Sequence, residues 1–369
     1  SKLNEVPIDV DKFVDTALKE IFKGNDSVNS NLYQATAVNM REAIGSSIGL
    51  EYNLKNQTWI NQLQTNTNVF SAFKAHHETE AITALLTDKG EVVPWNKFRD
   101  AALKVSDKYN KVHLKTEYNT ALRRGRMGER FIGFQDDADL YPNLRWLASS
   151  SAKPREAHIQ YYGLVLPVDD PFWNNQFPGN DWNCKCDIEQ TKDEAGKAPK
   201  DQPDPPPGLE GNPAFTNELI GSKHPYFDGL KKTESNAVMQ LVKNDMEAQT
   251  NNWAKANIGR NGLVVKNAIL QSGTLKMLKS NVKSMASVAD PFLKTYPTLL
   301  TDDVTNWEYL GYKSIDAKKN AGATKLLYYK TFYGDFEMYI TSKLTKSGIE
   351  QPIELFTDIS KVDFIKGDI

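Results

Sequence analysis

Both cysteines of this 369-residue chain fall in one triplet, and a histidine stands upstream of them in the same polar segment: Cys184, Cys186 and His158. Thiolate sulfur and imidazole nitrogen are ligands that Zn²⁺ commonly takes in proteins. Side chains at i and i+2 of a strand point to one side, so the two cysteines could chelate an ion to which the intervening loop brings the histidine. A fourth ligand is not evident, although three aspartates of the segment could serve: Asp169, Asp170 and Asp181. Zinc is therefore the candidate cofactor.

Two other interpretations of these residues remain open. In the first, His158 and Arg155 hydrogen-bond to the loop, while the cysteines pack as small apolar groups in a reducing cell. In the second, the cysteines form a disulfide, which between residues two apart needs unusual geometry. A Ser-His-Asp site built from the serines at 149–151 is excluded, because the spacing of a nucleophile elbow is missing. Elemental analysis of the purified chain would separate the metal from the other two interpretations.

The segment around these residues carries an ordered pattern. Arg-x-x-His is followed by a glycine, by an acidic pair before Pro-Phe-Trp, and by a closing Pro-Gly-Asn-Asp-Trp-x-Cys-x-Cys. This pattern resembles the phage Mu F-like minor head proteins, also called phage head morphogenesis proteins. Stretches at 66–73 and 114–121 and the His-Pro-Tyr-Phe run at 224–227 are similar to further elements of that family, so the resemblance covers about 66–227. The matching motif positions are Arg155, His158, Gly163, Asp169, Phe172, Trp173, Asp181, Trp182, Cys184 and Cys186.

The resemblance implies a protein that is carried in the phage head or needed to build it, located in the virion or in the cytoplasm of the bacterial host. The expected partners are the portal or other head proteins, and packaged DNA, with a role in head morphogenesis and in DNA packaging or ejection. The composition, 40% hydrophobic and 25% charged, excludes general disorder. No apolar run is long enough to span a membrane and no secretory signal opens the sequence, so we expect a soluble, intracellular protein without a membrane partner.

Family members often carry a toxin-like effector at the C-terminus, and the end of this chain resembles nucleases of the barnase, EndoU and colicin type. Cleavage of RNA needs a base, an acid and a cation at the phosphate, and all five histidines lie upstream of this region. The alternative is a degenerate or purely binding domain; an active toxin would have an immunity protein as partner. The candidate catalytic residues are Lys266, Lys330, Thr341 and Thr357, with Ser342 and Glu337 beside them.

One long helix is expected to begin near Trp95 and to end before Gly125 and Gly128, about 45 Å at 1.5 Å per residue. Its polar face is basic, although the whole chain has a net charge of only −2. Two interpretations are open: a solvated helix face, or a surface that contacts DNA or an acidic partner. The basic residues are Arg99, Lys104, Lys108, Lys111, Lys115, Arg123, Arg124, Arg126 and Arg130.

The spacing of apolar residues predicts an α+β fold in four regions. These are a mainly helical region at 1–150, a loop-rich F-like module with short strands at 151–190, a Pro-rich linker or wrapping arm with a docking segment at 191–251, and a small α+β domain at 252–369. The first helix is expected over 13–22 with Gly24 as its C-cap. In the last domain we expect a strand at 263–269, a helix at 275–288, and an antiparallel meander of strands at 326–332, 336–344 and 350–357.

Overall fold

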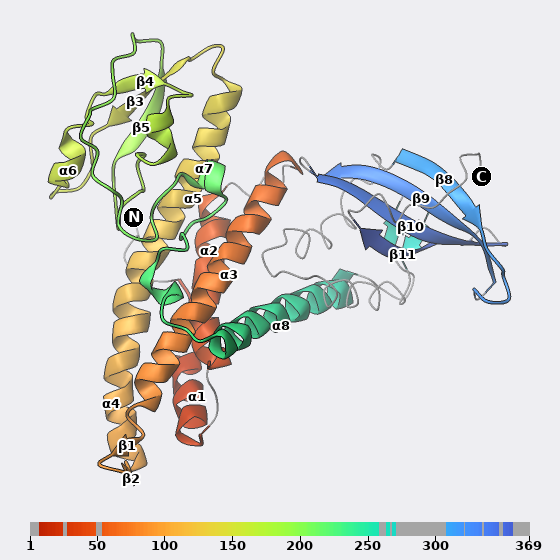
Figure 1. The fold of residues 1–369 in the computed structure, drawn as a ribbon, viewed down its shortest axis with the longest axis horizontal. Helices are drawn as coiled ribbons and strands as arrows, with labels where there is room; N and C mark the ends of the chain where they lie inside the picture. The colour runs from red at the N-terminus through yellow and green to blue at the C-terminus, as the bar shows by residue number, and fades with distance from the viewer. Residues whose placement is uncertain are drawn as a thin grey trace. The chain divides into compact units, whose positions relative to one another are not determined.

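The computed structural model describes residues 7–24, 28–48, 54–257, 263–265, 268–270, 308–320, 322–333, 336–346 and 350–356 (Figure 1). The chain separates into two compact units, one made of 1–51 and 62–242 and the other of 52–61 and 243–369. Long helices and short antiparallel strands alternate in it, which confirms the predicted α+β class. None of the helices in the described part is both long and apolar enough to cross a membrane.

The first unit is built on helices. They are α1 (Asp11–Phe22), α2 (Ser30–Ser47), α3 (Leu54–Thr83) from residue 62 onward, α4 (Trp95–Asp107) and α5 (Leu114–Asp136). A short hairpin of β1 (Thr87–Asp88) and β2 (Glu91–Val92) lies between α3 and α4. The α1 helix confirms the predicted apolar stripe, since Val14, Ala17 and Ile21 are buried. Gly24 has φ +86°, the left-handed conformation that glycine adopts easily after a helix. α1 and α5 both pack on α2.

The predicted long helix continues further than expected. α4 and α5 are joined without a break by a π-helical segment, η1 (Lys108–His113), and α5 passes through both glycines to Asp136 (Figure 1). The expected end before Gly125 was wrong because this glycine serves helix packing: a Cβ there would lie 2.4 Å from the Ser47 Oγ of α2. The close approach of the two helices therefore offsets the low helix propensity of glycine.

Gly125→Ala should lower the free energy of unfolding by about 1–2 kcal/mol, because the added methyl group overpacks the contact with Ser47. Gly133→Ala is the matched control in the same helix: nothing lies within 4 Å of its Cβ position, so this change should stabilise by about 0.5–1 kcal/mol. Thermal unfolding of both variants measures the difference. Equal shifts in the two variants would show that the glycine contact does not limit the packing of α2 on α5.

A three-stranded antiparallel sheet follows α5, in the order β4 (Val165–Pro167), β3 (Asn143–Leu147) and β5 (Asp187–Thr191). The connections hold α6 (Glu156–Ile159) and the 3-10 turn η2 (Pro171–Asn174). β3 is the central strand, so the module includes residues that the predicted boundary at 150 left in the helical region. Its core is largely aromatic and includes Trp146, Tyr161, Phe172, Trp173 and Phe177.

The Pro-rich segment after β5 wraps around the first unit. Its backbone bonds to the module at several points: Gly196 N donates to Val165 O (2.8 Å), and Pro203 O accepts from Gln176 Nε2 (2.7 Å). Next come α7 (Pro213–Thr216) and the 3-10 turn η3 (Pro225–Phe227). Asn66 Oδ1 of α3 accepts from the backbone N–H groups of residues 219 and 220, at 2.9 and 3.0 Å. The segment 191–227 is therefore a wrapping arm of the unit that contains the module.

The second unit contains the predicted meander, with one additional strand. The sheet order is β11 (Glu350–Phe356), β10 (Phe336–Thr345), β9 (Ala323–Tyr333) and β8 (Glu308–Ser314), all antiparallel. The three predicted strands are confirmed, whereas β8 was missed because Gly311 interrupts its alternation. The expected strand at 263–269 is a hairpin of β6 (Leu263–Val265) and β7 (Ala268–Leu270). α8 (Lys232–Asn257) precedes it, and the helix expected at 275–288 lies outside the described residues.

Candidate metal centre

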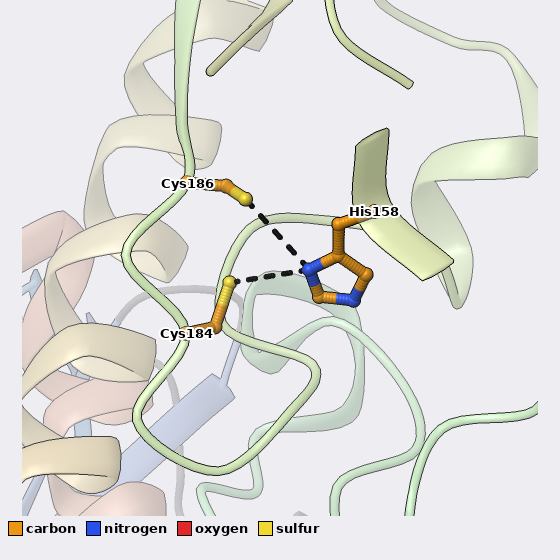
Figure 2. Close-up of side chains that lie close together, drawn as sticks. All are labelled: His158, Cys184 and Cys186. Carbon is orange, nitrogen blue, oxygen red and sulfur yellow. Dashed lines mark hydrogen bonds between the residues drawn. The ribbon is translucent and has the colours of Figure 1, made fainter. Parts of the chain in front are cut away.

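The structure brings together the three metal-ligand candidates of the sequence (Figure 2). His158 Nδ1 lies 3.6 Å from Cys184 Sγ and 3.7 Å from Cys186 Sγ. All three residues are at least nine-tenths buried, with exposed fractions of 5%, 5% and 2%. The histidine lies on α6, and the cysteines lie in the loop that leads into β5 rather than on a strand. Even so, their side chains converge on one nitrogen (Figure 2).

Arg155, the residue before α6, connects this helix to the segment 181–186 before β5, here called the cysteine loop. Its Nε lies 2.9 Å from Asp181 Oδ2, and its guanidinium also donates to Trp182 O. The other carboxylate oxygen, Asp181 Oδ1, accepts from Trp182 N at 2.7 Å, and Asp181 O accepts from Cys184 N at 3.1 Å. The motif residues Arg155 and Asp181 thus fix the distance between the histidine and the first cysteine.

The cysteine loop is also held from α5. Asn183 adopts φ +54°, a left-handed conformation that asparagine tolerates better than most residues, and its N–H donates to Thr120 Oγ1 at 3.1 Å. Arg123 Nε donates to Cys184 O at 2.6 Å. Lys185, between the two cysteines, is exposed, and its carbonyl accepts from Ser150 N. The loop thus turns both thiols inward and the intervening lysine outward.

The two thiols share their protons unequally. The pKa of the Cys184 thiol is lowered to about 4, first because Cys186 donates a hydrogen bond to it and also because His158 lies beside it, although burial opposes the shift. The pKa of Cys186 is raised because this thiol is the donor, and burial adds to the effect. The second thiol and the imidazole thus favour the thiolate form at Cys184, and thiolate is the form of cysteine that binds metals.

Aromatic residues of the motif form the wall behind the site. Trp146 meets His158 edge-on, with ring centroids 5.8 Å apart, and stacks on Trp173 at 6.3 Å. Trp173 is fully buried and donates through Nε1 to Pro167 O (2.8 Å), so it belongs to the core of the module. Trp182 is only half-buried and packs edge-on against His224. Phe172 lies in the same core as Trp173.

The remaining motif positions shape the backbone. Gly163 has φ +77°, and its N–H donates to Trp146 O at 2.9 Å, closing the turn between α6 and β4. Asp170 caps η2 by accepting from Phe172 N (2.8 Å), whereas Asp169 is exposed. Neither of these aspartates, nor Asp181, lies in the group of ligand atoms around His158 among the described residues. None of the three therefore completes the ligand set in this conformation.

The predicted basic face is confined to part of the long helix. Lys104, Lys108, Lys115 and Arg126 are exposed, and Lys111 is exposed and paired with Asp107 at 2.8 Å. The assignment of Arg124 to this face was wrong, because the side chain is fully buried and donates to backbone carbonyls of the wrapping arm. Arg123 is half-buried and is used by the cysteine loop, as described above. Arg99 and Arg130 are half-buried, and Arg130 pairs with Asp187.

The candidate catalytic residues of the second unit are only partly described. Lys330 is half-buried on β9, in register with Tyr339 of β10, and Thr341 and Ser342 on β10 are 4% and 1% exposed. Glu337 lies on β10, and Lys266 and Thr357 lie outside the described residues. The two hydroxyl groups are thus shielded from solvent.

Sequence reasoning missed a buried ionic cluster between α3 and the long helix. Lys74 on α3 pairs with Glu117 on α5. Glu78 is fully buried, burial raises its pKa to about 7, and its carboxylate accepts from Asn110 Nδ2 at 2.7 Å. The signal was present: Lys74 and Glu78 interrupt the face that carries Phe70, where apolar side chains are expected. A second group, His76, Glu80 and Glu234, includes an exposed carboxylate and is a weaker ligand set.

Comparison with known proteins agrees with the motif. Residues 56–189 match the family model described as Phage Mu protein F like protein. The chain is 33% identical over 75 residues to the "Putative capsid assembly protein F" of Escherichia phage Mu, covering 20% of this chain and 17% of that protein. It is 30% identical over 76 residues to the "Mu-like prophage FluMu F protein" of Haemophilus influenzae, covering 21% and 17%. No solved structure matches.

The matched region runs from α3 to β5 and contains the whole His158, Cys184 and Cys186 group. The resemblance to Mu F-like proteins is therefore confirmed for this part of the chain. The match ends at 189, before the wrapping arm and before residues 243–369, and the chain spans about a sixth of the length of the curated relatives it matches.

Proposed function

We propose that this chain is a capsid-related protein of a phage or prophage that acts in head morphogenesis, in the virion or in the host cytoplasm during assembly. The observation that carries the proposal is the family-model match over 56–189, because this stretch contains the motif that builds the cysteine loop and its sheet. The name of the phage Mu relative, a capsid assembly protein, supports the same role. Its partners in this proposal are the portal or other head proteins.

The exposed part of the basic face supports a contact with packaged DNA or with an acidic head protein during packaging or ejection. Lys104, Lys108, Lys115 and Arg126 extend into solvent from one continuous helix. If DNA is the partner, affinity should fall steeply with salt, since each phosphate contact releases counterions. A binding constant that does not change with salt would exclude DNA as the partner of this face.

The proposal predicts that the chain is found in assembled particles. A lysogen or infected culture producing the phage should yield proheads and virions in which mass spectrometry detects the chain after gradient purification. Deletion of the coding sequence should reduce the yield of filled heads, and supply of the full chain from a plasmid should restore it. A supplied chain with Lys185→Ala is the matched control, since this exposed residue lies in the loop but points away from its centre. Absence of the chain from both proheads and virions would overturn the proposal.

No observation favours the alternative of a ribonuclease effector with an immunity protein as partner. The matched region does not reach residues 243–369, where the candidate catalytic residues lie, and the hydroxyl groups of Thr341 and Ser342 are buried.

A further inference from the structure

The ligand atoms of His158, Cys184 and Cys186 converge in a geometry that suits a bound ion as well as thiol–imidazole hydrogen bonds. An imidazole nitrogen has one lone pair in the ring plane and accepts a single hydrogen bond well. Two sulfur atoms nevertheless lie at nearly equal distances from His158 Nδ1, 3.6 and 3.7 Å, and all three ligand atoms are within 4.8 Å of one another (Figure 2). One atom at the centre of the group satisfies all three at once.

The distances agree with tetrahedral zinc. Zinc–sulfur bonds of about 2.3 Å and a zinc–nitrogen bond of about 2.0–2.1 Å at the tetrahedral angle place the nitrogen and sulfur about 3.6 Å apart. The two observed distances, 3.6 and 3.7 Å, match this value. The ion would therefore enter without a rearrangement of the backbone on either side.

We propose that His158, Cys184 and Cys186 bind one Zn²⁺ ion, which joins α6 to the loop before β5, with water as the fourth ligand. Two thiolates and a neutral imidazole around a divalent cation leave no net charge, which suits a site that is nine-tenths buried. Sulfur ligands select zinc over Mg²⁺ and Ca²⁺, which prefer oxygen. The proposal does not depend on the role in the phage head.

The surroundings of Cys186 support a thiolate ligand. Trp146 Nε1 and the Tyr162 hydroxyl are buried hydrogen-bond donors without a partner in the described part of the chain, and both side chains pack in the core that contains Cys186. Donors available beside a ligand sulfur can orient it and stabilise its negative charge, as the outer groups of metal sites do. The Arg155–Asp181 pair holds the opposite side of the loop.

Metal analysis of the full chain tests the proposal. The chain purified under reducing conditions should contain about one zinc ion, a stoichiometry that elemental mass spectrometry measures. Cys184→Ser, Cys186→Ser and His158→Gln should each lower the bound zinc by about tenfold or more. Lys185→Ala, the exposed residue between the two cysteines, is the matched control and should keep its zinc. Ligand variants that stay folded, judged by hydrogen exchange of β3 and β5, and keep their zinc would overturn the proposal.

A second measurement does not depend on the folding of variants. Metal-free wild-type chain titrated with Co²⁺ should develop a thiolate-to-cobalt charge-transfer band and the visible bands of a tetrahedral ion, both of which added Zn²⁺ removes. Absence of these bands, together with absence of zinc in the purified chain, would overturn the proposal. A mass decrease of two hydrogens in the chain isolated without reductant, together with failure to bind Co²⁺ after reduction, would assign the pair to a disulfide instead.

Discussion

Lys74→Met should lower the free energy of unfolding by about 3–5 kcal/mol, because it leaves the carboxylate of Glu117 buried without its partner. Lys74 is fully buried on α3, and its Nζ donates both to Glu117 Oε2 and to Tyr109 O, the latter at 2.9 Å. Glu117 is 4% exposed, so water cannot replace the ammonium group. Urea unfolding of the full chain measures the loss, with hydrogen exchange of α3 and α5 assigning the transition to the first unit.

The loss caused by Lys74→Met should depend on pH. Burial raises the pKa of Glu117, and Lys74 is the group that opposes this shift. Without the lysine, the folded pKa rises further above the unfolded value, so the folded state binds more protons and stability falls as pH rises above about 4.5. The variant should therefore lose more relative to wild type at pH 8 than at pH 5.

Two further variants distinguish the effect of breaking the buried Lys74–Glu117 pair on stability from the effect of losing any lysine. Lys19→Met breaks the exposed pair of Lys19 with Asp15 and should cost less than about 1 kcal/mol. The double change Lys74→Met with Glu117→Leu removes both buried charges and should recover most of the loss. If Lys74→Met destabilises no more than Lys19→Met, the buried pair does not stabilise the contact between α3 and α5.

Arg124→Met should open the wrapping arm and cost about 3 kcal/mol, since four carbonyl acceptors lose one buried donor. Arg124 donates through Nη1 to Leu209 O at 2.9 Å and Gly179 O at 3.3 Å, and through Nη2 to Gly211 O at 2.9 Å and Glu210 O at 3.4 Å. Limited proteolysis read by mass spectrometry should show faster cleavage at 200–212 in the variant. Arg124→Lys should not rescue, because an ammonium group lacks the planar fork that reaches four carbonyls.

The matched control for the arm is two residues further along α5. Arg126 is exposed and makes a single long bond, 3.3 Å, to Ser46 O. Arg126→Met should therefore change stability by less than about 0.5 kcal/mol and leave the cleavage pattern of the arm unchanged. An arm that stays as protected in Arg124→Met as in Arg126→Met would show that other contacts hold it.

Local sequence patterns were sufficient to predict the helices and strands whose formation is decided by residues close to them in the sequence. The stripe of α1 and the alternation in β9 to β11 predicted those elements, because apolar period and turn residues decide them locally. The π-helical segment η1 could not be predicted in this way, since a single extra residue in a helix leaves the composition of the stripe almost unchanged. The position of η1 along the long helix depends on which of its residues contact α3, as Asn110 and Glu117 do.

The same distinction applies to the candidate site. Residue type was enough to select His158, Cys184 and Cys186, and the structure places them together. The fourth ligand could not be selected by type, because Asp170 and Asp181 are used by η2 and by Arg155. Arg124 was placed on the wrong side of its helix because its acceptors are 55 and 85–87 residues away, beyond the reach of any local pattern.

The number of residues between Arg124 and its acceptors in the wrapping arm also sets an order of events during translation. The guanidinium emerges from the ribosome before three of its four acceptors have been synthesised, 85–87 residues later. At roughly 5–20 residues per second, α5 waits roughly 4–17 s with this charge in water. The helices of the first unit can assemble in that interval, but the unit closes only when the arm has been made, so its folding is completed from the C-terminal side.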